Sequence, residues 1–127
     1  MTSILKYLSI ATIILSQSTL AATVSMVNNT KTKMDLEFSY CNDHNFCSHT
    51  ANYTLNKKGD ASNSYTIMLP NDMHKLQITS AKIYDENNNL TASLAKSCNN
   101  AGRETSTIVL DSYGTSKIHC LSVDVKA

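Results

Sequence analysis

The sequence predicts an all-β protein: an antiparallel β-sandwich of immunoglobulin-like shape, with about seven or eight strands and two disulfides. Three observations lead to this fold class. Apolar and polar residues alternate along several short segments, as they do in strands that bury one face. Asparagine-rich turns separate these segments at intervals of roughly 8–12 residues, a spacing typical of sandwiches and small barrels. The cysteines follow an apolar leader, which predicts an oxidising compartment.

The leader, residues 1–21, is predicted to be a signal peptide that is cleaved after Ala21, with cleavage after Ala22 as the alternative. It has a positive start at Lys6, a short apolar run and small residues at its end. The apolar run is shorter than the ~20 residues of a spanning helix, so we expect no stable membrane insertion. Residues 22–127 are then a single secreted or periplasmic β-sandwich domain.

Composition argues against several classes of function. The 127 residues include 11 basic and 10 acidic side chains, and removal of Lys6 with the leader leaves ten of each. No basic run is long enough to neutralise a row of phosphates, so nucleic acid is not an expected partner. With 3 glycines in the chain, there is no glycine-rich phosphate loop.

The first half of the domain contains the clearest strands. Apolar side chains occupy every second position from Met34 to Tyr40, which places them on one face of a strand. Later segments repeat the pattern, and in one of them Met68 falls on the polar face. The predicted strands of this half are residues 24–27, 33–41, 50–55 and 64–69.

The second half is less regular. Its apolar phase switches within residues 76–83, which predicts a bulge or a bend near Ser80. Leu121 and Val123 are in phase with His119, so we expect His119 to be a partly buried strand residue. Residues 90–94 suit either a short strand or one turn of helix. The predicted elements of this half are residues 76–83, 90–94, 107–110 and 118–125.

Asparagine replaces glycine and proline in most of the predicted turns. Its side chain bonds to the backbone of its own turn and it tolerates left-handed backbone. Residues 56–59 resemble a hairpin loop with Gly59 at the left-handed position.

Four cysteines allow three pairings. Cys41 and Cys47 bracket a short loop between two predicted strands, where a disulfide would close the mouth of a hairpin. Cys98 and Cys120 would then form the second bridge. The spacing lacks the Cys-x-x-Cys of a redox pair and the paired short spacings of a zinc site, so structural disulfides are favoured.

Phe46 is the aromatic residue that does not fit the core phase, because it lies at the tip of the Cys41–Cys47 loop. A stapled loop that offers an aromatic beside His44 and His49 suits contact with a protein or carbohydrate partner. The alternative is that Phe46 folds down onto the rim of the sandwich.

A metal site is the main competing hypothesis. Met68, Met73 and His74 surround a turn, and thioether with imidazole suits Cu(I). His44 and His49, with Asp43, suit zinc or copper instead. Apart from this alternative we expect no cofactor.

Nothing in the chain indicates catalysis. There is no Gly-x-Ser-x-Gly elbow, and the carboxylates that hydrolysis would need, such as Glu37, Asp85 and Glu104, are scattered. We therefore expect a non-catalytic binding or interaction module rather than an enzyme. The alternatives are an extracytoplasmic copper- or zinc-binding protein and a small secreted hydrolase without a recognisable motif.

Overall fold

The computed structural model describes residues 22–42, 44–70, 73–100 and 105–124, without the side chains of His49 and Asp124. Within these residues there are strands and no helix. The predicted signal peptide, residues 1–21, lies outside the described residues. So do three other residues named in the sequence analysis: Asp43, Glu104 and Val125. The strands are β1 (Thr23–Asn28), β2 (Met34–Cys41), β3 (Cys47–Leu55), β4 (Ser64–Met68), β5 (Lys75–Tyr84), β6 (Leu90–Leu94), β7 (Cys98–Asn99), β8 (Thr105–Asp111) and β9 (Lys117–Asp124).

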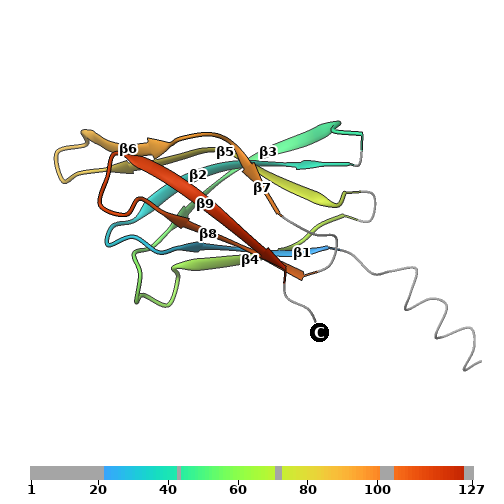
Figure 1. Cartoon of the computed structure of the whole chain (residues 1–127), viewed down its shortest axis with the longest axis horizontal. Coiled ribbons are helices and arrows are strands. Elements are labelled where there is room, and N and C mark those ends of the chain that lie inside the picture. Colours follow the sequence, from blue (N-terminus) through green and yellow to red (C-terminus); the bar gives the residue numbers. More distant parts are fainter. Residues whose placement is uncertain (1–21, 43, 71–72, 101–104, 125–127) are drawn as a thin grey trace, which may run out of the picture.

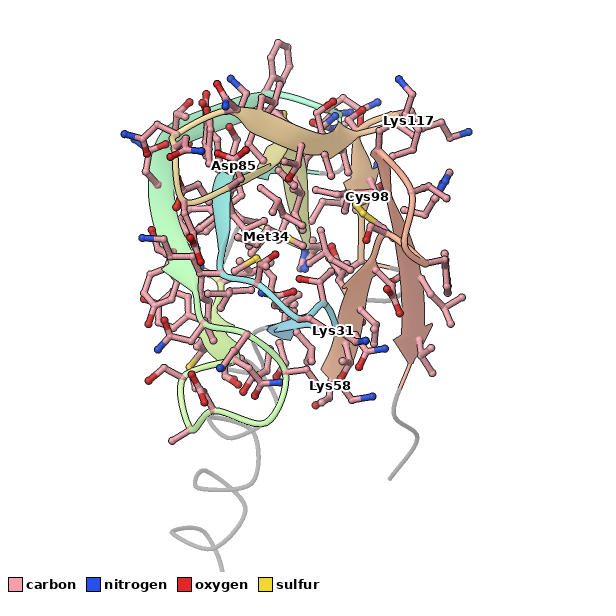
Figure 2. The ribbon with its side chains drawn as sticks, turned by 90° about the vertical axis from the view of Figure 1, so that its left-hand side faces the viewer. Lys31, Met34, Lys58, Asp85, Cys98 and Lys117 are labelled. Atoms are coloured by element: carbon pink, nitrogen blue, oxygen red, sulfur yellow. A yellow bond between two sulfur atoms is a disulfide. The ribbon has the colours of Figure 1, made fainter. Side chains whose placement is uncertain are left out.

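The strands form one continuous sheet in the order β3-β2-β5-β6-β9-β8-β1-β4, with β7 paired to β5 beside this path. The sheet curls so that the half made by β3, β2, β5 and β6 faces the half made by β9, β8, β1 and β4 (Figures 1 and 2). The all-β class and the two disulfides are confirmed. The immunoglobulin-like sandwich is not confirmed. Such a sandwich has two separate sheets, whereas here the pairing of β6 with β9 joins the two halves into one sheet.

The backbone joint between the two halves is short. It consists of a parallel pairing of Ser93 with Lys117 and Leu94 with Ile118. Beyond it, the Cys98–Cys120 disulfide bridges the halves, and its sulfur–sulfur bond is visible in Figure 2.

At the opposite side of the curl, the edge strands β3 and β4 meet through side chains. Tyr53 of β3 and Tyr65 of β4 stack with their ring centroids 3.9 Å apart and their planes 3° from parallel. Tyr40 lies near this pair, and its pKa is raised by burial and by the neighbouring Tyr65. Stacked rings therefore connect the two ends of the strand order.

The hydrophobic core lies between the two halves of the sheet. Figure 2 labels one of its buried residues, Met34, whose side chain points into this space. The bulge predicted near Ser80 is present: Glu37 pairs with Ser80 and Phe38 with Ile78, which leaves Thr79 as the extra residue of β5. The bulge turns both apolar phases of β5 inward. As a result Leu76, Ile78, Ala81 and Ile83 are all buried.

The phase predicted for the last strand is wrong. Leu121 and Val123 of β9 point outward and are 59% and 46% exposed, and His119 is exposed with them. This segment carries apolar residues in both phases, so alternation alone does not select the inner face. Ile118 and the disulfide at Cys120 fix the inward phase.

Turn chemistry follows the sequence closely. Gly59 adopts a left-handed φ of 96°, and Asn45 and Asn88 each adopt a φ of 62°. Tyr113, with a φ of 49°, is a left-handed residue that turn propensities do not predict. Residues 90–94 form a strand, which settles that alternative.

Asn28 is a buried polar residue that holds together the loops at one end of the molecule. Its side-chain amide donates to the carbonyl oxygens of Thr32 at 2.8 Å and Asn56 at 2.9 Å. Its Oδ1 accepts from the backbone N–H and the hydroxyl of Thr30, at 2.9 and 2.7 Å. The side chain is fully buried. Its two bonds from Thr30 form away from water, and its bonds to Thr32 and Asn56 are part-buried.

Replacing Asn28 with alanine should lower the free energy of unfolding by about 2–4 kcal/mol, because the buried N–H of Thr30 and the part-buried carbonyls of Thr32 and Asn56 lose the Asn28 side chain as a partner. Chemical denaturation measures this loss. Asn87→Ala, in an exposed turn, is the matched control and should stay within about 0.5 kcal/mol of the parent. Equal effects of the two variants would contradict the structural role of Asn28.

The two disulfides should contribute unequally to stability. The cysteines of the Cys98–Cys120 bridge are 22 residues apart in sequence, and those of the Cys41–Cys47 bridge are 6 residues apart. Loop-closure entropy predicts losses of roughly 3 and 2 kcal/mol when each pair is replaced by alanines. Thermal unfolding of the two double variants compares them. A larger loss from the Cys41–Cys47 pair would show that loop entropy is not the main contribution.

Candidate functional site

The candidate contact residues and the candidate metal ligands lie at the same end of the molecule. Strands β2, β4 and β7 end there, and β3, β5 and β8 begin there. These strand ends therefore lie at the right-hand end of Figure 1. The first residues of β1 and the last of β9 reach the same end, because Thr23 pairs with Thr105 and Ser106 with Asp124. We call this the Cys41–Cys47 end.

The loop between β2 and β3 is held at several points besides its disulfide. The N–H of Asn42 donates to the carbonyl of Phe46 at 3.0 Å, and the N–H of Asn45 donates to the carbonyl of Asn42 at 3.0 Å. The side-chain oxygen of Asn42 accepts from the N–H groups of His44 at 2.9 Å and Phe46 at 3.0 Å. Lys75 then donates to the side chain of Asn45 at 2.9 Å. The backbone on either side of Phe46 is thus fixed by local bonds.

Phe46 projects from this fixed loop into solvent, with 72% of its surface exposed. The alternative in which its ring folds onto the rim is therefore wrong. An exposed aromatic ring on a constrained backbone gives up little conformational entropy when a partner covers it. His44, also exposed, lies two residues away on the same loop. His49 belongs to β3, but its side chain is outside the described part of the structure.

Sequence reasoning missed the residue that positions the neighbouring loop, Asn100. This buried side chain accepts from the N–H of Leu76 at 2.8 Å and donates to the carbonyl of His74 at 3.0 Å. The N–H of His74 in turn donates to the carbonyl of Cys41 at 3.2 Å. An asparagine at this position gives no sequence signal of such a role, because its partners lie more than twenty residues away.

The predicted copper ligands differ in their exposure to solvent. Met68 is 73% exposed on the outer face of β4, whereas Met73 packs against the core. His74 is partly buried in the loop beside Met73. Among the described side chains, no group of three His, Cys, Asp or Glu residues is arranged to hold a metal ion.

The carboxylates considered for hydrolysis are far apart in the fold. Glu37 is exposed on the outer face of β2, and Asp85 lies in the turn between β5 and β6. Asp85 accepts bonds from the N–H groups of Asn87 at 2.8 Å and Asn89 at 2.9 Å. The bond from Asn89 is the largest cause of its lowered pKa. Asp85 therefore organises a turn.

No known protein family matches the chain, and neither does any curated protein sequence. A solved structure with some likeness is the NMR structure of a protein from Eubacterium rectale. It shares 12% sequence identity over 80% of this chain and 89% of that chain, with a TM-score of 0.44. Within the described residues, no helix has the length and apolarity needed to cross a membrane.

Proposed function

We propose that the protein is a non-catalytic binding module whose contact surface is the Cys41–Cys47 end, with Phe46 at its centre and His44 beside it. The single observation that carries the proposal is the exposure of the Phe46 ring, 72%, on a loop fixed by a disulfide and local hydrogen bonds. His49 follows on β3 and is included as a flanking contact.

Energetics favour an aromatic contact of this kind. Burying a phenylalanine ring contributes roughly 1.5–3 kcal/mol when it leaves water, and aromatic residues are enriched among the few residues that dominate binding energies. The loop neighbours, two asparagines and a histidine, offer hydrogen bonds around the ring. Such a surface suits a protein partner, and a sugar face stacked on the ring is the second possibility.

Photo-crosslinking tests this proposal. A photoreactive phenylalanine analogue at position 46 should capture a defined partner from the extracytoplasmic fraction of the source organism. The captured partner, once purified, should bind Phe46→Ala at least tenfold more weakly, the change expected for losing ~1.4 kcal/mol of contact energy. Tyr113→Ala is the matched control, because Tyr113 is 70% exposed in the turn between β8 and β9 at the other end. Equal binding by both variants would refute the Phe46 surface.

We also propose that the chain is exported to the periplasm or the medium and processed after Ala21. Two disulfides support an extracytoplasmic location. The intact mass of the exported protein should correspond to a chain beginning at Ala22 and should increase by four hydrogens on reduction. A mass that includes residues 1–21, or free thiols before reduction, would contradict the proposal.

For the fold class, we propose the immunoglobulin-like sandwich as the finer assignment. The two facing halves around one core support it. Hydrogen exchange tests it at the β6–β9 contact, where the N–H groups of Ser93 and Ala95 bond to Ser116 and Ile118. Rapid exchange of these two amides would agree with two separate sheets, and strong protection would contradict them.

A further inference from the structure

We propose that the free edge of β3 is a docking site for an extended basic peptide, which would add to the sheet as a further strand with its lysines or arginines on the outer face. This inference rests on the proposed function in so far as the protein is a binding module. It concerns a different surface, however, because the edge lies beyond Phe46 along β3. Three observations carry it, and each is independent of the Phe46 loop.

The first observation is that β3 ends the strand order and, among the described strands, pairs only with β2. Its regular part, residues 50–55, contains no charged residue and no proline. Proteins usually protect an exposed edge with such residues, or with a bulge, and here the bulge lies before this stretch, at His49. The backbone of residues 50–55 is therefore open to a new strand.

The other end strand offers less. β4 has five residues, and Pro70 follows it closely in sequence. Its outward side chains, among them Thr66 and the exposed Met68, carry no charge. An incoming strand would find there a shorter edge and no electrostatic selection.

The second observation is a groove of about 330 Å³ on the outer face, directly inside the β3 edge. Asn52 and Thr54 form its side nearest the edge, and Glu37 and Asp35 lie opposite them on β2. The hydroxyl of Thr54 donates to Asp35 at 2.8 Å. The groove therefore presents two carboxylates to any side chain that reaches over β3.

Charge in the groove is only partly balanced. Lys82 of β5 lies beside Asp35 in the strand register, whereas Glu37 has Ser80 and Asn52 beside it. Glu37 is thus the carboxylate without a cationic neighbour in register. An added strand would lie two strand spacings, roughly 10 Å, from β2. Lysine and arginine combine the positive charge and the long stem that can approach Glu37 from there.

The third observation concerns the inner face of the same edge. Tyr53, between Asn52 and Thr54, points inward and stacks on Tyr65, and both rings are only partly buried. A residue of the added strand opposite Tyr53 would also point inward, onto the side of this stack. An apolar side chain is the one that gains from that contact.

These faces define the occupant. Residues opposite Asn52 and Thr54 point outward toward the carboxylates and should be basic, whereas the residue opposite Tyr53 points inward and should be apolar. The fitting ligand is an extended peptide in which lysine or arginine alternates with apolar residues. Backbone hydrogen bonds to β3 provide affinity, and the two side-chain faces provide selectivity.

The test uses the full-length mature protein and a labelled, end-capped peptide with the sequence Lys-Val-Lys-Val-Lys-Val. Fluorescence anisotropy should show saturable binding, with weaker binding of the isomer Lys-Lys-Lys-Val-Val-Val. Glu37→Gln should weaken binding about threefold, the effect of losing one exposed ion pair. Glu86→Gln, an exposed carboxylate in the turn after β5, is the matched control and should bind as the parent does.

Residue-resolved hydrogen exchange identifies the binding mode. In the free protein only alternate amides of residues 50–55 bond to β2, and the peptide should protect the others. No saturable binding, binding unaffected by Glu37→Gln, or binding without this new protection would each overturn the inference. Phe46→Ala should leave peptide binding unchanged. Failure of the peptide experiment therefore leaves the Phe46 surface to its own crosslinking test, and the two failures are distinguishable.

Discussion

The joint between the two halves of the sheet is the constraint on which the rest of the structure depends. Among the described strands, the ladder of paired backbone passes from one half to the other through the short parallel contact of β6 with β9. The Cys98–Cys120 disulfide follows immediately and prevents the halves from separating where that contact ends. On the opposite side of the curl, β3 and β4 are held together by the Tyr53–Tyr65 stack and not by strand pairing. One side of the curl is therefore closed by a covalent bond and the other by a contact between side chains.

This asymmetry explains where the molecule has surfaces to offer. The side closed by the disulfide gives β9 a fixed inward phase, which leaves Leu121 and Val123 outside. The other side leaves the edges of β3 and β4 unpaired among the described strands. A fully closed barrel would have hidden those edges in hydrogen bonds. The half-open curl keeps them available while the core between the halves stays buried.

Most of the fold could be predicted from local sequence, and the exceptions have a physical cause. Alternation placed β2 correctly because its polar positions are unambiguous, and the phase switch in β5 revealed the bulge at Thr79. The phase of β9 could not be predicted, because both of its faces carry apolar residues and a distant cysteine decides between them. For the site, loop position and phase singled out Phe46. The roles of Asn28 and Asn100 depend on partners from other strands, and local sequence contains no trace of these.

The arrangement of the termini has a practical consequence. β1 begins and β9 ends at the Cys41–Cys47 end, so the first and last described strands start and finish at the end of the molecule that carries the ring of Phe46. A sensor surface, a bulky fusion partner or an affinity resin joined through either terminus would crowd that ring and mask contacts made in solution. Attachment through the opposite end, for example at a cysteine introduced in the exposed loop around Lys58, would present the Phe46 ring freely.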